Sequence, residues 1–345
     1  MAVNNETVDV SIEALRDLCL RIVAKTGMPP DEAGIFVETL IEADRRGVHS
    51  HGVVSLTRYV RLLLDGTMKP AVQWTVVRDK GPTAVWDGER SNGQMLGHKA
   101  MKEAIQKAKE FGIGMVCVRN ANHFGAAAYY AQLAESEGMI GISMSTAAPT
   151  MAPWGGADKL TGNNPLAVAV PAKAHAPLVL DMAQSVVAVG KIDNLKRQKK
   201  AELPAGWALD SDGVPTDKME KVFTAAPFGA YKGSGLALII EVISGLMFGG
   251  ATAPESADAK RGTSMCMCAI DIEAFSGRES FLGVIDDRID ELKSSRLAAG
   301  SEAIYMPGEI EHNKHEAATK NVTLIREIVA ELNDLAEETG VDGKI

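Results

Sequence analysis

Residues 113–145 read IGMVCVRNANHFGAAAYYAQLAESEGMIGISMS, and this stretch decides the fold class. It contains an apolar run, the polar turn RNANHFG, an alanine-rich helical segment and a second apolar run, in that order. A strand, a helix and another strand in succession indicate a protein of mixed α/β class. The turn places His123 and Gly125 at the start of the helix, where free backbone N–H groups favour a negatively charged ligand.

The segments on both sides extend this mixture. Apolar or alternating runs between turn residues predict strands at 74–79, 83–87, 166–171, 177–183 and 265–272. Cys266 and Cys268 would share one face of the last strand. Helical spacing predicts a helix over 94–111, and the apolar segment 233–250, opened by glycines, is predicted to be a buried helix. These elements predict an α+β-like arrangement, in which a mixed sheet is flanked by helices.

Both ends of the chain show helical periodicity. Ser11 can cap a first helix, another is predicted over 51–65, and the C-terminal part predicts an amphipathic helix over 320–339. The Ser50–His51 pair would then lie at a helix N-terminus. We therefore expect two parts, which are a helical subdomain from both termini (1–70 with 310–345) and a mixed-sheet region (71–309).

Composition and charge exclude several classes of partner. The 345 residues carry a formal net charge of -9 and no basic stripe, so nucleic acid is not expected to bind. No apolar run reaches ~18 residues, so a membrane span is not expected. The N-terminus lacks the pattern of a signal peptide, and the four cysteines lack C-x-x-C spacing. These features predict a cytoplasmic protein whose partner is a small molecule.

Three histidines lie in predicted turns, where chemistry is most readily placed. His49, Ser50 and His51 follow a glycine turn, and His123 lies in the RNANHFG turn. A histidine in such a position can act as a general acid or base near neutral pH. His49 and His51 could instead bind a metal, with His123 or Asp181 as a third ligand, although H-E-x-x-H is missing. A metal-dependent hydrolase using His49, His51 and His123 is therefore kept as an alternative.

Nucleotide-binding fingerprints are missing. Lys232 lies among glycines but lacks the order of a P-loop, although it could still meet a phosphate as a point charge. The sequences at 112–117 and 233–238 lack the third glycine of the Rossmann fingerprint. Asp181 ends an apolar strand, where it could be a helix cap or a functional carboxylate. From the residues alone, the protein is an α/β enzyme with histidine-bearing turns and an anionic ligand.

Six segments together resemble a known family. In order, they are DRRGVHSHGVVSLTRY, VRNANHFGAAAYYA, TGNNPLAVAVP, LVLDMAQSVVAVGKI, PFGAYKGSGLALIIEV and MPGEIE. Over nearly its whole length the chain resembles the type-2 malate/L-lactate dehydrogenase family. This resemblance implies an oxidoreductase that uses NAD or NADP, with a non-Rossmann nucleotide-binding fold, which explains the missing fingerprints. It also implies a homodimer with active sites near the subunit interface.

The implied reaction is hydride transfer between nicotinamide and a small 2-hydroxy acid or its 2-keto partner, as with malate, lactate or sulfolactate. A reductase of a cyclic imine or of a sugar-derived keto acid is the alternative within this class. A non-catalytic nucleotide-binding module is an alternative outside it.

The resemblance also implies roles for individual residues. Ser50, His51 and Asp181 match a catalytic relay in which the carboxylate orients the imidazole. His123 matches a proton acceptor in some members, whereas in others its turn contacts the cofactor, and the two roles stay open. The residues that match cofactor contacts are Asn122, His123, Phe124, Gly125, Asp181, Met182, Ala183, Lys232, Pro307, Gly308 and Glu309.

Several positions depart from the family pattern, and these concern the substrate. The residues that replace a usual one are His49 (aspartate), Ser55 (arginine), Asn163 (threonine), Gln184 (threonine) and Ala230 (glycine). The arginine missing at Ser55 would grip the substrate carboxylate. Arg58, one helical turn later, could replace it. Alternatively, the substrate carries a hydroxyl or a bulkier group there, which the changes at Asn163 and Gln184 favour. We thus assign Ser55, Arg58 and Asn163 to the substrate.

Overall fold

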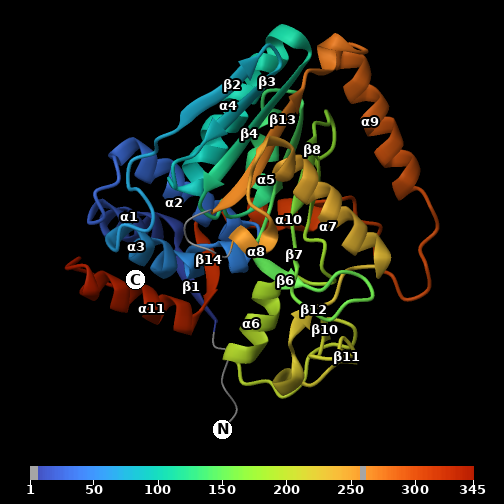
Figure 1. The fold of residues 1–345 in the computed structure, drawn as a ribbon. Coiled ribbons are helices and arrows are strands. Elements are labelled where there is room, and N and C mark those ends of the chain that lie inside the picture. Colours follow the sequence, from blue (N-terminus) through green and yellow to red (C-terminus); the bar gives the residue numbers. More distant parts are fainter. Residues whose placement is uncertain (1–6, 257–261) are drawn as a thin grey trace.

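The computed structural model describes residues 7–256 and 262–345 (Figure 1). The helices are α1 (Ile12–Ala24), α2 (Pro30–Arg45), α3 (Leu56–Leu64), α4 (Gly93–Phe111), α5 (Ala127–Glu135), α6 (Val189–Arg197), α7 (Tyr231–Ser244), α8 (Ala253–Ser256), α9 (Arg278–Lys293), α10 (Glu309–Ala317) and α11 (Arg326–Glu338). The strands are β1 (Thr7–Ser11), β2 (Thr75–Lys80), β3 (Thr83–Asp87), β4 (Ile113–Ala121), β5 (Ile140–Ser145), β6 (Pro149–Met151), β7 (Thr161–Gly162), β8 (Leu166–Val170), β9 (Leu178–Met182), β10 (Ala208–Leu209), β11 (Pro215–Thr216), β12 (Thr224–Ala225), β13 (Thr263–Ile270) and β14 (Asn321–Ile325).

A seven-stranded mixed sheet lies at the centre, in the order β2-β3-β4-β13-β5-β8-β9. Strands β3 and β4 run parallel, and the other neighbouring pairs are antiparallel. Helices α4 and α5 pack on one face with a shared buried core, and α7 lies against the other face (Figure 1). The mixed α/β class is confirmed, as are the strand–turn–helix–strand order of β4, α5 and β5 and the pairing of β8 with β9.

Strand β13 separates β4 from β5, although it comes much later in the chain. Cys266 of β13 faces Cys117 of β4 on one side and Met144 of β5 on the other. Cys266 is fully buried and Cys268 is half-buried, and both cysteines are free thiols. The register shows that these two cysteines share the sheet face under α7, as their spacing predicts.

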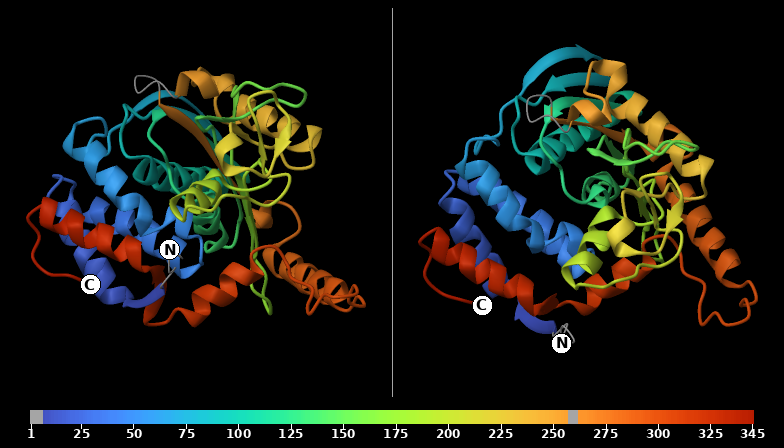
Figure 2. Two further views of the ribbon diagram at one scale, coloured as in Figure 1. Left: turned by 90° about the horizontal axis from the view of Figure 1, so that it is seen from below. Right: turned by 60° about the horizontal axis from the view of Figure 1, so that its bottom comes forward.

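The two ends of the chain come together in a helical region with its own core. This core combines buried residues of α1, α2 and α3 with those of β14 and α11, and β1 pairs with β14 (Figure 2). The predicted helix over 320–339 is wrong in its first part, because Asn321–Ile325 form a strand that pairs antiparallel with β1. Val322 and Leu324 are buried and alternate with exposed residues, which favours a strand over a helical turn.

The predicted helix over 51–65 is also wrong in its first part. Two 3₁₀ turns, His49–His51 and Val53–Ser55, precede α3, which begins at Leu56. Gly52 between the turns is extended (φ -83°, ψ -153°), and this conformation interrupts any continuous helix. The Ser50–His51 pair therefore lies in a 3₁₀ turn rather than at the N-terminus of an α-helix.

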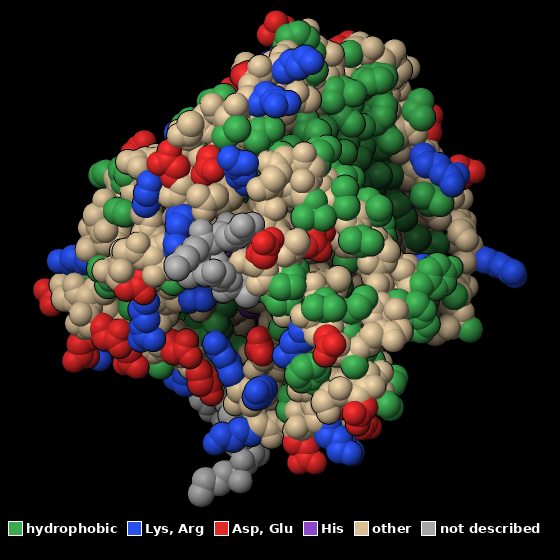
Figure 3. All heavy atoms as spheres, viewed as in Figure 1, with side chains coloured by type: hydrophobic (Ala, Val, Ile, Leu, Met, Phe, Trp, Pro, Cys, Tyr) green, Lys and Arg blue, Asp and Glu red, His purple; other side chains and the backbone are tan. Residues whose placement is uncertain are grey.

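Helix α7 was predicted to be buried, and this is correct for one face only. Ala237 and Ile240 pack against the sheet, whereas Leu238 and Ile239 on the outer face are 52% and 53% exposed. Among the described residues, Tyr231–Phe248 is the one segment whose length and composition would allow it to cross a membrane. Apolar side chains gather on the molecular surface over this side of the sheet (Figure 3).

A second, smaller sheet of short strands lies beside α6, in the order β11-β10-β12-β6-β7 (Figure 1). Its small core combines Met151 and Ala225 with Ile192 of α6 and Ala237 of α7. A Cβ at Gly190, in the first turn of α6, would lie 3.1 Å from the Cβ of Ser50. The short-stranded part of the fold therefore approaches the 3₁₀ turn that carries Ser50 and His51.

Candidate active site

The turn that carries Ser50 and His51 is anchored by a buried carboxylate. Asp44, whose side chain is 1% exposed, lies near the end of α2. Its Oδ1 contacts Nδ1 of His49 at 2.9 Å, and its Oδ2 accepts a hydrogen bond from the backbone N–H of Val53 at 2.8 Å. Burial raises the pKa of Asp44, and the hydrogen bonds from His49 and Val53 oppose this effect. Both ends of the turn are thus held by one side chain.

His49, which departs from the family pattern, therefore has a partner within the protein. Its Nδ1 contacts Asp44, so one of its two ring nitrogens is engaged within the protein. Within residues 7–256 and 262–345, no cluster of histidine, cysteine, aspartate and glutamate side chains has the arrangement of a metal site.

His51 and His123 lie together, although they come from distant parts of the chain. Their rings are stacked, with centroids 5.9 Å apart and an interplanar angle of 18°. The hydroxyl of Ser50 lies 3.0 Å from Nδ1 of His51. The hydroxyl of Tyr59, in α3, lies 2.6 Å from Nδ1 of His123. The 3₁₀ turn, α3 and the β4–α5 turn thus bring two imidazoles and two hydroxyls into one cluster.

Both imidazoles in this cluster favour the neutral form. Burial lowers the pKa of His51, and the guanidinium of Arg58 lowers it further. Burial lowers the pKa of His123 well below its usual value, with further effects from Arg58 and His51. Arg58 is exposed, with its guanidinium carbon 5.0 Å from the centre of the Tyr59 ring. A fixed positive charge therefore stands beside two neutral bases.

Asp181 lies at the end of β9, against the first turn of α5. Its Oδ2 accepts a hydrogen bond from the backbone N–H of Ala128 at 3.0 Å. Burial raises the pKa of Asp181 to about 6, Glu311 acts in the same direction, and the Ala128 bond opposes the shift. The residue keeps solvent-accessible surface even though many protein atoms surround its carboxyl. No hydrogen bond joins it to Ser50 or His51 in the described chain, so the relay stays a prediction.

The β4–α5 turn can offer its backbone to a ligand more readily than its side chains. The side-chain nitrogen Nδ2 of Asn122 donates to the backbone carbonyl oxygens of Arg90 and Ser91, at 2.6 and 3.2 Å. The Phe124 ring is buried and stacks on Tyr130. Of the predicted cofactor contacts here, Asn122 and Phe124 are thus held by the protein itself.

The other predicted cofactor residues border the Asp181 strand or α7. Met182 and Ala183 follow Asp181 and are half-buried. The carbonyl oxygen of Pro307 accepts from the N–H of Val179 at 2.9 Å, and Gly308 (φ +80°) packs directly on Val179. The Glu309 carboxylate forms an ion pair with Lys293 at 2.6 Å and accepts a hydrogen bond from the N–H of Met306 at 2.8 Å. Lys232, in the first turn of α7, is exposed and has no ion pair within the described residues.

The residues assigned to the substrate differ in their surroundings. Ser55 makes one long hydrogen bond, 3.5 Å to the carbonyl oxygen of Ser50, so its hydroxyl is close to the His51 turn. Asn163 is half-buried, and its carbonyl oxygen accepts from the N–H of Gln184. Gln184, a departure from the family pattern expected near the substrate, is completely buried. Its contacts are with the protein, including a bond to the carbonyl oxygen of Met182.

Two residues of the cluster, Tyr59 and Gln94, carry no functional signal in the sequence. Tyr59 occupies an apolar position of the α3 pattern, and nothing in the sequence links it to His123. Gln94 lies in the first turn of α4, fully buried, and neither its amide oxygen nor its amide nitrogen has a hydrogen-bond partner among the described residues. A Cβ at Gly125 would lie 3.7 Å from that nitrogen. The sequence shows only a glutamine at the start of the predicted helix, and its burial is known from the structure alone.

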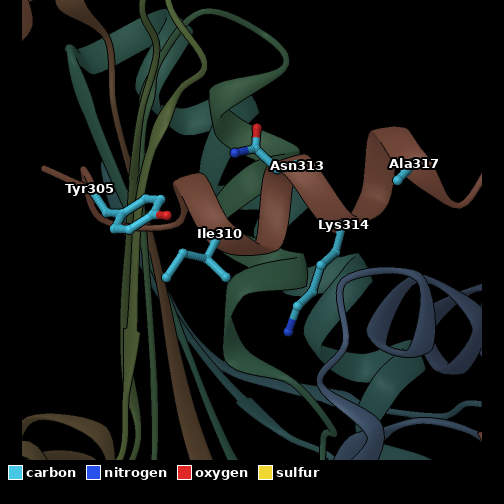
Figure 4. A pocket seen from close by; sticks show the side chains of 5 residues that line it. All are labelled: Tyr305, Ile310, Asn313, Lys314 and Ala317. Atoms are coloured by element: carbon cyan, nitrogen blue, oxygen red, sulfur yellow. The ribbon is translucent and has the colours of Figure 1, made fainter. Parts of the chain in front are cut away.

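A separate surface pocket of about 390 Å³ lies along α10 (Figure 4). It is lined by Tyr305, Ile310, Asn313, Lys314 and Ala317. Ile310 and Lys314 extend from the same side of the helix, and Asn313 points to the opposite side (Figure 4). None of the histidines of the cluster lines this pocket.

Comparisons with known proteins agree with this arrangement. The family described as malate/L-lactate dehydrogenase matches residues 10–333. The malate dehydrogenase of Pyrococcus abyssi is 38% identical over 99% of this chain and 98% of its own. The L-sulfolactate dehydrogenase of Methanocaldococcus jannaschii is 37% identical, over 95% and 96%. The solved structure of malate dehydrogenase from Pyrococcus horikoshii OT3 superimposes with a TM-score of 0.91 at 36% identity, covering 99% and 98%.

The chain therefore belongs to the malate/L-lactate dehydrogenase family. It is an oxidoreductase of the hydroxy-acid dehydrogenase type, and its family implies a nicotinamide cofactor. The resemblance drawn from the six sequence segments is confirmed. The metal-dependent hydrolase receives no support from these comparisons, and a non-catalytic nucleotide-binding module does not agree with them.

Proposed function

We propose that the protein oxidises a small 2-hydroxy acid to the corresponding 2-oxo acid, and reduces it in reverse, with NAD or NADP. One observation carries the proposal, which is the exposed guanidinium of Arg58 beside the stacked, neutral His51 and His123. A guanidinium binds a carboxylate with two parallel hydrogen bonds, and a neutral imidazole can accept the proton of the neighbouring hydroxyl.

The residues present fit a nicotinamide dinucleotide. Gly125 has a positive φ of +80°, and the residues after it, 126–128, are alanines whose small side chains let a ligand approach the start of α5. Lys232 adds an exposed positive charge that suits a phosphate. When bound, the nicotinamide ring supplies the acceptor for the hydride that leaves the substrate carbon.

His51 is the base in the oxidation direction. Its Nδ1 lies 3.0 Å from the hydroxyl of Ser50. We assign the ring proton to Nδ1, with Ser50 as its acceptor, so that Nε2 can accept the proton of the substrate hydroxyl. Because its lowered pKa keeps His51 neutral, the base is ready at neutral pH. As the proton passes to Nε2, the carbon–oxygen double bond forms and the hydride leaves the same carbon.

We assign the substrate carboxylate to Arg58 rather than to a residue at position 55. The guanidinium of Arg58 lies over the ring of Tyr59, whose hydroxyl contacts His123. Its charge lowers the pKa of both histidines. Ser55 has a short, neutral side chain that offers one donor. This arrangement supports the first alternative, in which Arg58 replaces the arginine of the family pattern, over a substrate with a hydroxyl at that place. The malate and L-sulfolactate dehydrogenases among the relatives make dicarboxylic and sulfonated hydroxy acids the first compounds to assay.

A homodimer and a cytoplasmic location complete the proposal. The outer face of α7 exposes Leu238 and Ile239, and Met247 in the turn that follows α7 is also exposed. Exposed apolar side chains that gather on one face often mark an interface between proteins. We propose that a second copy of the chain covers this face. The four cysteines are free thiols, as is usual in a reducing compartment.

The test of the reaction is absorbance at the nicotinamide band. Each cofactor is combined with malate, lactate, sulfolactate, a sugar-derived keto acid and a cyclic imine, with and without a chelator. We expect turnover of a 2-hydroxy acid that the chelator leaves unchanged. Activity on the cyclic imine or the sugar acid alone would replace the proposed substrate class. Loss of activity with the chelator, and its return with zinc, would contradict the proposal.

A further inference from the structure

Two hydrogen bonds converge on one nitrogen of His123. The backbone N–H of Gly125 donates to Nδ1 over 3.3 Å, and the hydroxyl of Tyr59 lies 2.6 Å from the same atom. A backbone N–H can only donate, so Nδ1 must present its lone pair. The proton of the neutral imidazole then lies on Nε2.

We propose that His123 acts as a neutral Nε2–H donor to the carbonyl oxygen of the substrate, and that Tyr59 is the positioning residue that holds it in this tautomer. The inference rests on the proposed function, because it assigns a role within the same site. In this scheme His51 accepts the proton. His123 donates a hydrogen bond instead of accepting a proton, which is the role that the family resemblance allowed for it.

The surroundings of His123 oppose a charged ring. The titratable and charged groups that face it are Arg58 and Tyr59 of α3 and His51 of the 3₁₀ turn. Arg58 repels a second positive charge, and burial removes the water that would stabilise it. Tyr59 is itself 1% exposed, and burial raises its pKa, so it keeps its hydroxyl proton to donate. Neither the contacts nor the charges stabilise an imidazolium at this position.

Tyr59 is held firmly enough to act in this way. Its ring meets the ring of Phe36 edge-on, with centroids 5.6 Å apart and an angle of 81°. The Gln94 amide, which lacks a hydrogen-bond partner among the described residues, is also close to the hydroxyl of Tyr59. Tyr59 thus connects the helical core to the β4–α5 turn, and His123 cannot rotate without breaking the 2.6 Å contact.

The two histidines then divide the chemistry. In the oxidation direction, the substrate hydroxyl gives its proton to Nε2 of His51 and the hydride leaves the same carbon. The carbonyl oxygen that forms accepts a hydrogen bond from Nε2–H of His123. In the reduction direction, the same N–H stabilises negative charge on that oxygen before the proton returns from His51. One preorganised donor of this kind contributes roughly 10²–10³-fold in turnover.

The decisive measurement is the tautomer of His123, observed by nitrogen NMR of the full chain without substrate. The resonances are assigned by their loss in His123→Gln. We expect an unprotonated Nδ1 and a protonated Nε2 that do not titrate from mildly acidic to mildly basic pH. A proton on Nδ1, or titration of the ring near neutrality, would overturn the inference, whatever the enzyme turns over.

Variants connect the tautomer to the reaction. Tyr59→Phe should let His123 populate both tautomers and should lower kcat about tenfold with little change in KM, the effect of one lost hydrogen bond of about 1.4 kcal/mol. Tyr129→Phe is the matched control, because Tyr129 contacts Nδ1 of His98 at 3.2 Å, outside the site. An unchanged tautomer and kcat in Tyr59→Phe would refute the role of Tyr59. If the tautomer is as described but no 2-hydroxy acid is turned over, the proposed function fails instead.

Discussion

Gly52 lies so close to Asp44 that a Cβ at position 52 would be 2.2 Å from the Oδ1 of that carboxylate. The position of the Asp44 carboxylate and the absence of a side chain at position 52 therefore depend on each other. Only a residue without a side chain lets the buried carboxylate reach His49 and the N–H of Val53, and only that carboxylate holds the turn with Ser50 and His51 in place. The position of the proposed base depends on this contact.

Gly52→Ala is the first test of this relationship. Overpacking of this kind typically costs about 1–3 kcal/mol, so the free energy of unfolding should fall by that amount. Turnover should fall further than the loss of folded protein explains, because His51 moves with the turn. Chemical unfolding and steady-state kinetics measure the two effects. Gly34→Ala in α2 is the control, since a Cβ there has no neighbour within 4 Å. Full turnover in Gly52→Ala would show that the turn tolerates displacement.

His51→Ala tests the identity of the base. General acid–base catalysis contributes roughly 10²–10⁴-fold, so turnover should fall by that factor while cofactor affinity hardly changes. Fluorescence of the reduced cofactor measures its affinity independently of activity. His98→Ala, which changes another partly buried histidine outside the site, should leave turnover unchanged. Survival of turnover in His51→Ala, with its loss in a His123 variant, would reverse the two roles.

Arg58→Ala tests the carboxylate clamp. A hydrogen bond to a charged group contributes about 1.5–3 kcal/mol, so kcat/KM on 2-hydroxy acids should fall roughly 10- to 150-fold. The control is Arg61→Ala, because Arg61 lies on the same helix but pairs with Glu338 at 3.3 Å.

A second variant separates the two explanations for position 55. If Arg58 binds the substrate carboxylate, Ser55→Arg should not raise kcat/KM on simple 2-oxo acids by a large factor. If the substrate instead carries a hydroxyl near Ser55, kcat/KM of Ser55→Arg on simple 2-oxo acids should rise by roughly 10- to 150-fold. In that case Arg58→Ala should hardly change kcat/KM.

The raised pKa of Asp181 predicts how stability depends on pH. The folded pKa is about 6, and the unfolded value of an aspartate is about 3.9. The folded state therefore binds the proton more tightly, and this contribution to stability is complete below about pH 4 and is lost as the pH rises through 6. The free energy of unfolding, measured with urea at several pH values, should decrease between about pH 4 and pH 6 in the unmodified protein. Asp181→Asn should remove this decrease. An identical pH dependence in the two proteins would contradict the assignment.

The proposed dimer is tested on the outer face of α7. Ile239→Glu places a charge on a side chain that is 53% exposed in the single chain, so it should leave the fold intact and separate the subunits. Sedimentation velocity measures the change in mass. Leu64→Glu is the control, because Leu64 is 56% exposed on α3, away from α7. A dimer that survives Ile239→Glu would place the interface elsewhere.

Local patterns in the sequence predicted most of the individual elements. The run over 113–145 gave β4, α5 and β5 because periodicity and turn residues act within a few positions. The errors occurred where a distant segment decided the local structure. Asn321–Ile325 extends because β1 is available to pair with it, and residues 51–55 leave the helical path because Asp44 takes the N–H of Val53.

The candidate site was less predictable than the fold. The motifs identified His51, His123 and Asp181, since each lies in a recognisable turn or strand end. The contact between Tyr59 and His123 joins residues 64 positions apart, and periodicity carries no information about such a pair. In the sequence, His49 is a departure from the family pattern, and only the geometry shows that Asp44 provides its partner.

The position of β13 between β4 and β5 has a consequence for folding while the chain is being synthesised. When the ribosome has released β5, the strand that will separate β4 from β5 is still about 120 residues away, which is roughly 6–24 s of synthesis. During that interval the facing edges of both strands are unpaired, and unpaired edges recruit other chains. Newly made protein should therefore depend on chaperones until Cys266 has joined its neighbours on both sides.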